Sequence, residues 1–253
     1  SQYGAASAAI GVAMAENVIG HDVNSAGQVV AVGAGKPANV IQALVENTQV
    51  AAGAVSVEAR NARLKTDGSV EREQHIRAVV VAGAAAVSVA YAPPIVDGLS
   101  LSVSAAGAGA RAVNQIKTDI TARISDASAP WEVGGIDVLA LDRARIDSHI
   151  SAVALAAAVS LGGSAALSIA VSLAQNEVAN TVRASMERIE VLTTPAITVR
   201  ADSAAHITTV AVAVSISGAF GVGGIALAGG GAHARNLIRS SAAATVSHAR
   251  LKG

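Results

Sequence analysis

The sequence predicts an all-β protein: an elongated stack of repeated units, with a β-solenoid favoured and long antiparallel β-hairpins in layered sheets as the alternative. Three observations predict this class. One pattern recurs around an asparagine, long segments alternate bulky residues with small or polar ones, and aromatic residues make up only 2% of the chain. A period of two is typical of strands. With so few aromatic residues, the core must form from small and β-branched side chains.

Four asparagines define the repeat: Asn17, Asn114, Asn176 and Asn236. An apolar residue follows each of them two positions later, and further matches occur at six positions (Val23, Ile120, Val182, Ala242) and at eight (Ser25, Ala122, Ala184, Ala244). The asparagines are 97, 62 and 60 positions apart. We therefore expect residues 1–253 to form a single array of units of about sixty residues, with an insertion in the first unit near residues 24–39.

A second recurring segment lies between the asparagines, at 55–64, 136–146 and 197–207. The last two copies align without a gap, and the first needs one deleted residue. The charged stretch 65–77, KTDGSVEREQHIR, interrupts the first copy. It is typical of a solvated loop or hairpin, so we expect a second insertion there.

The clearest strand signal covers residues 116–124, where Ile116, Ile120 and Ile124 alternate with polar residues. This pattern predicts a strand with one buried and one wet face. By contrast, residues 153–176 alternate bulky and small residues with scarcely a polar group, and such segments usually need cover on both faces. Each unit is thus expected to have a half-exposed part near the asparagine and a fully covered part near the glycines. Trp131, in the turn 126–135, is expected to cap an end of the stack.

Composition limits the classes of partner. The chain has 18 basic and 18 acidic residues and no cysteine, so nothing indicates a nucleic-acid or anionic-membrane partner, a disulfide or thiol chemistry. Residues 207–232 lack charge, but their alternation and glycines favour strands over a membrane helix. No membrane insertion is expected, and membrane-embedded β-structure stays an alternative. No basic segment opens the chain, and both ends fall within a repeat, so we expect a piece of a longer array.

The motif most typical of an enzyme is Gly33-Ala-Gly35 after VVAV, because it resembles the GxGxxA loop that approaches a pyrophosphate. In that alternative, Val40, Ile41, Leu44 and Val45 form one face of a helix, and Glu58 binds a ribose hydroxyl. Pro37 interrupts the loop, however, and no acid occupies the position of Glu58 in later copies. We therefore expect no enzyme and no cofactor, and nucleotide binding remains the alternative.

No other residues form a recognisable site. None of the six histidines belongs to a short metal-ligand pair. Asp137, Asp142 and Asp147 recur every five residues, a spacing that alternates sheet faces and does not gather carboxylates. We predict no catalytic, cofactor-binding or metal-binding residues. For the four asparagines we expect a structural role, either as a hydrogen-bonded ladder or as turn caps.

The pattern AVAVSISG at 211–218, followed by a glycine pair and the asparagine segment, resembles the tandem repeats of giant bacterial surface exoproteins. These are the filamentous-haemagglutinin-like adhesins and autotransporter passengers. The resemblance implies export to the cell surface, an elongated β-rich stalk, and a role in adhesion or matrix building. It also implies association of the chain with itself, with fibres as an outcome, and contact with other cell-surface molecules.

Overall fold

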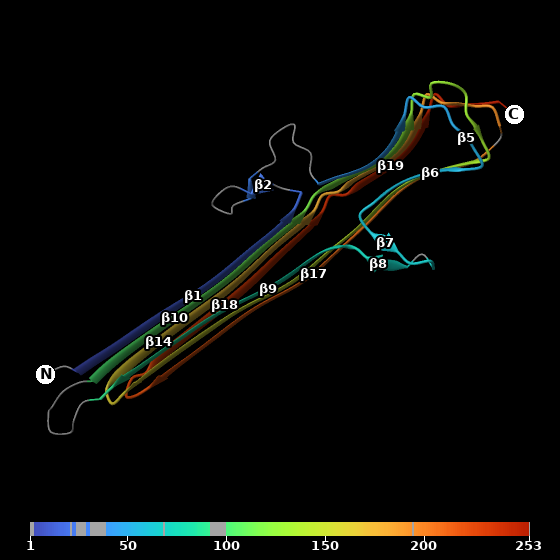
Figure 1. The fold of residues 1–253 in the computed structure, drawn as a ribbon. Helices are drawn as coiled ribbons and strands as arrows, with labels where there is room; N and C mark the ends of the chain where they lie inside the picture. Colours follow the sequence, from blue (N-terminus) through green and yellow to red (C-terminus); the bar gives the residue numbers. More distant parts are fainter. Residues whose placement is uncertain are drawn as a thin grey trace.

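The computed structural model describes residues 3–20, 22–23, 29–30, 39–67, 69–91, 100–193 and 195–252. Over these residues the chain consists of strands and the turns between them, as the alternation in the sequence predicts. No described segment forms a helix that is long and apolar enough to span a membrane. The strands form an elongated stem of two layers (Figure 1).

The first layer contains the long strands β1 (Tyr3–Ile19), β10 (Ser100–Ile116), β14 (Gly163–Val178) and β18 (Ile225–Ile238). It continues in β4 (Asn39–Glu46), β11 (Thr118–Ser125), β15 (Thr181–Glu187) and β19 (Ser241–Ser247). The second layer contains β6 (Val55–Arg60), β9 (Gln74–Ala90), β13 (Gly135–Ser160) and β17 (Ala196–Phe220). Short strands between the layers are β5 (Ala51–Ala52), β12 (Glu132–Val133), β16 (Glu190–Val191) and β20 (Arg250–Leu251).

All long strands pair in parallel, in the orders β1-β10-β14-β18, β4-β11-β15-β19 and β6-β13-β17, with β9 also on β13. Each strand lies beside its equivalent in the next unit. Ile136 is opposite both Val55 and Ile197, as the aligned second segments require. The antiparallel-hairpin alternative is therefore wrong for the long strands. Among the described residues, antiparallel pairing occurs between β2 (Asp22–Val23) and β3 (Val29–Val30), and between β7 (Arg63–Leu64) and β8 (Val70–Arg72).

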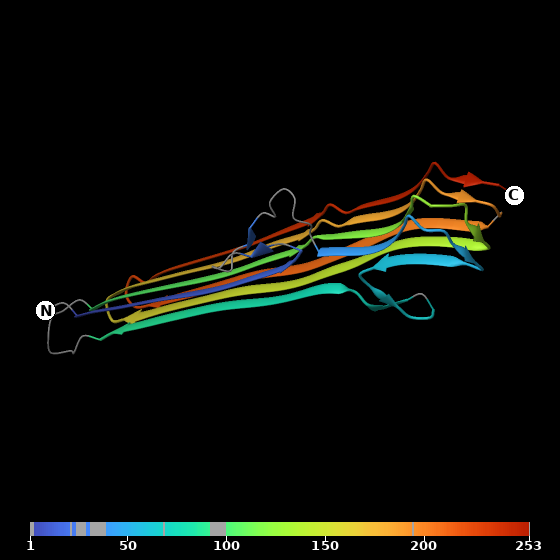
Figure 2. The same cartoon turned by 45° about the horizontal axis from the view of Figure 1, so that its top comes forward.

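The chain runs outward in one layer and returns in the other, so the two layers face each other along the stem (Figure 2). We call the end where β13 turns into β14 the tip half, and the end that contains β4, β11, β15 and β19 the base half. The tip lies near the N label in Figure 1, and the base lies near the C label.

The interior differs between the two halves. In the tip half it consists almost entirely of alanine and serine, such as Ala154, Ala170 and Ser172. In the base half it contains branched and large side chains, such as Ile120 and Met186. Small side chains let the backbones of the two layers come close, and a Cβ added to Gly11 in β1 would overlap the Gly83 carbonyl oxygen in β9.

The insertion in the first unit begins earlier than the sequence pattern suggests. Strand β4 occupies the place beside β11, with Ile41 opposite Ile120 and Ala43 opposite Ala122. Val23 instead lies in β2, away from the stack, and Ser25 lies outside the described residues. The assignment of Val23 was wrong because an apolar residue at the right offset is indistinguishable, in sequence alone, from the strand that resumes after an insertion.

The second insertion forms the β7–β8 hairpin, which agrees with a solvated excursion. Its position differs, however, because β6 ends at Arg60 and β9 resumes at Gln74. Residues 74–77, assigned to the insertion from their charge, belong to β9, where His75 lies opposite Arg145. Their outward side chains are polar because this part of the strand has a wet face.

Two further expectations are wrong. Trp131 does not cap the stack: it lies in the second of the four units, is 1% exposed, and its indole N–H donates to the Thr48 carbonyl oxygen of the unit before it. The strands near the glycines are not covered on both faces either. Leu155 and Ile169 point outward and are 41% and 49% exposed, because the two-layer stem provides cover on the inner face alone.

Candidate functional site

The side chains of the four asparagines meet at one level of the stem, where Asn114 and Asn176 are buried and Asn236 is exposed at the edge of the stack. The side-chain amide of Asn17 donates to Asn114 Oδ1 over 2.8 Å, Asn114 donates to Asn176 over 2.7 Å, and Asn176 donates to Asn236 over 2.9 Å. The sequence spacing thus brings all four together as a ladder in which every amide points the same way. Such ladders fix the register between stacked strands.

The ladder also joins the two layers. Asn114 donates to the Ser148 hydroxyl over 3.3 Å, and Asn176 donates to the Thr209 hydroxyl over 2.7 Å. Both hydroxyls come from the second layer, on β13 and β17. The inner asparagines are fully buried, and their amide and carbonyl groups have partners. The geometry therefore indicates a structural role for this set.

Replacing Asn114 with leucine is expected to lower the free energy of unfolding by about 1–3 kcal/mol, because the partly buried Asn17 amide and the buried Asn176 carbonyl each lose a partner. The measurement is equilibrium denaturation followed by circular dichroism. Gln115→Leu, one residue later and pointing outward, is the matched control and should stay within about 0.5 kcal/mol of the parent. Equal losses for the two variants would contradict a ladder that stabilises the stem.

A second interior polar cluster surrounds Asp142, which is fully buried in β13. Asn61 donates to one carboxylate oxygen over 2.6 Å, Asn180 donates to both oxygens over 2.9 and 3.0 Å, and Ser203 donates over 2.8 Å. Donors from the units before and after thus converge on one carboxylate of the unit between them. As the five-residue spacing predicts, Asp142 points to the opposite side of the strand from Asp137 and Asp147. Sequence reasoning missed its role.

A residue with left-handed backbone conformation recurs at the base end of every unit. The residue that follows β4, β11, β15 and β19 has a positive φ in each unit: Asn47 at 52°, Asp126 at 56°, Arg188 at 51° and His248 at 53°. This left-handed conformation turns the chain out of the first layer. Asparagine, aspartate and histidine are enriched in this conformation and arginine is not, so the residue types carry a partial signal that sequence reasoning missed.

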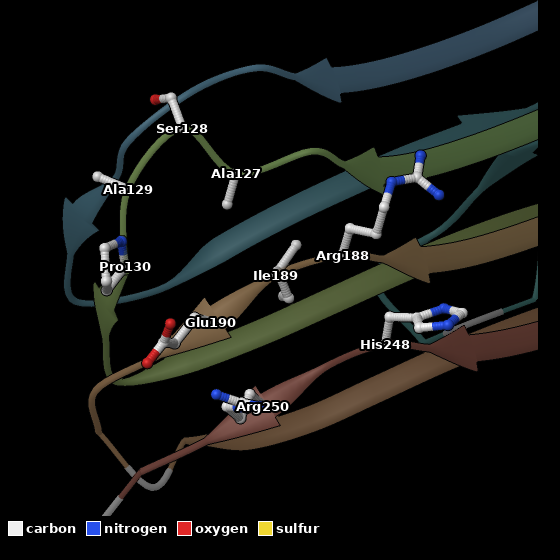
Figure 3. A pocket seen from close by; sticks show the side chains of 9 residues that line it. All are labelled: Ala127, Ser128, Ala129, Pro130, Arg188, Ile189, Glu190, His248 and Arg250. Atoms are coloured by element: carbon white, nitrogen blue, oxygen red, sulfur yellow. The ribbon is translucent and has the colours of Figure 1, made fainter.

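An open depression lies beside this turn (Figure 3), lined by Ala127, Ser128, Ala129, Pro130, Arg188, Ile189, Glu190, His248 and Arg250. Ser128 and His248 lie at opposite sides of it. Among the described residues, no hydrogen bond joins His248 to Ser128 or Glu190. Asp126 pairs with Arg188, and Lys252 pairs with Glu190. The depression therefore lacks the contacts of a nucleophile and its base.

Ion pairs join side chains on the outer face of the second layer, in the base half and near the middle of the stem. The Arg143 guanidinium donates to Asp202 over 3.0 Å and lowers the pKa of that carboxyl, with a further contribution from Arg200. Near the middle of the stem, Arg145 donates to Asp147 over 2.8 Å and lowers its pKa, and His75 contributes to the same shift. These charges link neighbouring units across the surface of the second layer.

Asp202→Asn is expected to lower stability at neutral pH by up to about 1 kcal/mol, the size of a partly exposed ion pair. Because folding lowers the pKa of Asp202 below its ordinary value of 3.8, this contribution is present above that pH and disappears as the pH falls through the lowered pKa. Denaturation curves at several pH values check this. A difference between parent and variant that persists unchanged in strong acid would contradict it.

The residues of the nucleotide-binding alternative are only partly described. Gly33, Gly35 and Pro37 lie outside the described residues. Residues 39–46 form strand β4, so the prediction of a helix there, which that alternative requires, is wrong. Glu58 lies on the outer face of β6, where it pairs with Arg60. Within the part of the chain that the structure describes, no phosphate-binding turn lies beside Glu58.

Across the described parts of the chain, no group of three or more His, Cys, Asp or Glu residues has the arrangement of a metal site. His75 lies beside Asp147, and His206 lies beside Thr208, both on the outer face of the second layer. Comparison with protein-family models, curated proteins and solved structures finds no match for this chain.

Proposed function

We propose that this chain is a β-solenoid segment that acts as a structural or adhesive stalk of a large exported bacterial surface or matrix protein. Each turn of the coil would comprise an outgoing strand in the first layer and a returning strand in the second. The observation that carries the proposal is the in-register parallel pairing of four successive asparagine segments. Such a stack provides length and a repeated surface rather than an enclosed pocket.

The two edges of the stack support self-association. β1 and β9 form one edge, and β18 and β17 form the other. Exposed edge strands present unpaired backbone groups that accept a further strand. Because every amide in the asparagine ladder points the same way, the two edges are complementary, and copies would add head to tail into an open filament. Other cell-surface molecules are the second class of partner in this proposal, and the location is extracellular or at the cell surface.

Electron microscopy of the purified chain over a range of concentrations tests the proposal. We expect rods that lengthen with concentration, with a diffraction spacing of about 4.8 Å along the rod axis, since that is the distance between paired strands. Asn236→Leu alters the ladder at the exposed edge and should shorten the rods, whereas Arg239→Leu, nearby on the same edge, serves as control. Monomers at every concentration would refute filament formation.

A further inference from the structure

We propose that the tip half inserts into a lipid bilayer that contains anionic lipids, with the base half remaining in water. In the second layer Val153, Leu155 and Val159 point outward, and in the first layer Leu167, Ile169 and Val171 do the same. These residues are between 39% and 49% exposed although their strands lie in the middle of the stack. Their inner neighbours are alanine and serine, so the larger apolar side chains face outward.

Both outer faces of the tip are apolar, and this identifies the partner. A second copy that packs against one face leaves the other face exposed to water. A lipid phase covers both faces at once, and removal of each aliphatic side chain from water is favourable. Apolar patches of this extent on a protein surface mark an interaction site.

The length of the apolar region fits a bilayer. No charged residue occurs between His149 and Glu177, a segment that includes the end of β13, the turn and most of β14. In β14 the outward apolar positions extend from Gly163 to Leu173. At roughly 3.3 Å per residue this region is about 35 Å long, close to the hydrocarbon thickness of about 30 Å.

Basic residues surround the stem where the apolar region ends. Arg111 and Arg235 lie on the first layer, and Arg77, His75 and His149 lie on the second. Arg77, Arg111 and Arg235 have no ion-pair partner among the described residues. Three acids lie at the same level: Asp147, which pairs with Arg145 and His75, Glu177, which pairs with Arg239, and Glu16 on β1. Basic side chains at this level suit the phosphates of anionic lipids. The zero net charge of the chain does not reveal this local arrangement.

Open sheet edges are unfavourable in hydrocarbon because their backbone groups lack partners. In the head-to-tail stack proposed above, neighbouring copies pair these edges. The pairing of the open edges within the bilayer therefore depends on the proposed function. The apolar faces and the basic residues are independent of it, and the test distinguishes binding to lipid from association between copies.

Flotation with lipid vesicles tests the inference. The full chain is mixed with vesicles of phosphatidylcholine and phosphatidylglycerol at about three to one, or of phosphatidylcholine alone, and separated on a density gradient. We expect flotation with the mixed vesicles and several-fold weaker flotation with the neutral ones. The double variant Leu155→Glu/Ile169→Glu should bind the mixed vesicles at least about tenfold more weakly than the parent, because each glutamate would enter hydrocarbon. The matched variant Leu139→Glu/Thr121→Glu, on the outer faces of the base half, should bind like the parent.

A depth measurement completes the test. Tryptophan introduced by Leu155→Trp should be quenched by lipids that carry bromine on their acyl chains, whereas Trp131 of the parent, in the base half, should not be. Circular dichroism verifies that the variants keep the strand content of the parent. The inference is overturned if the parent does not float, if the tip and base variants bind equally, or if the tip variant merely abolishes association between copies in solution. If the chain forms filaments but does not float with vesicles, this inference fails and the proposed function does not.

Discussion

Replacing Asp142 with leucine is expected to lower the free energy of unfolding by about 3–5 kcal/mol, because it removes one member of a buried charged network and leaves the others buried. Asn61, Asn180 and Ser203 would each keep a donor without its acceptor. These donors belong to the units on either side of Asp142, so the network joins three successive units and its loss should weaken the stack as a whole. The measurement is denaturant unfolding followed by circular dichroism.

Asp137→Leu is the matched control, since Asp137 lies in the same strand and points outward. It should change stability by less than about 0.5 kcal/mol. Asp142→Asn tests the charge alone: the amide keeps the shape of the side chain but places a donor opposite donors, so an intermediate loss is expected. Similar stability for Asp142→Leu and Asp137→Leu would show that the buried network does not stabilise the stem.

The two halves of the stem are expected to respond oppositely to changes in side-chain size. In the base half, Ile120→Ala should cost about 2–5 kcal/mol, because it removes a fully buried side chain and leaves a cavity. In the tip half, Ala154→Leu should cost about 1–3 kcal/mol, because the layers approach too closely to accept added methylenes. Thermal and denaturant unfolding of the purified variants provide the measurement.

Ala157→Leu is the control for the tip, since Ala157 is on the same strand but points outward. It should be tolerated, and the contrast with Ala154 reports the close packing of the layers. A tip that accepts leucine at Ala154 without loss would mean that the two layers can separate there.

The sequence was informative where the repeat is regular. The asparagine spacing predicted which strands lie side by side, and the alternation at residues 116–124 predicted which face is buried; Ile116, Ile120 and Ile124 are all fully buried. Parallel pairing did not follow from the alternation, because strands in either orientation share a period of two.

The remaining features depend on contacts between units. Asp142 is one of three evenly spaced aspartates, and its burial is evident only once Asn61 and Asn180 are placed around it. The exposure of Leu155 was missed because a continuous apolar run usually indicates a strand covered on both faces. Here the small inner residues form the core, and the larger residues face outward.

Cysteine cross-linking tests the parallel in-register stack most directly, because the chain has no cysteine of its own. Asp137 on β13 lies opposite Thr198 on β17, and both side chains point outward. The Cα atoms of such a pair are about 5 Å apart, within the range of a disulfide, whereas a shift of two residues increases the distance to about 8 Å. We predict that the variant Asp137→Cys/Thr198→Cys forms an intramolecular disulfide efficiently and that Asp137→Cys/Arg200→Cys does not. Equal cross-linking of the two variants, or a disulfide in the second alone, would contradict the stack.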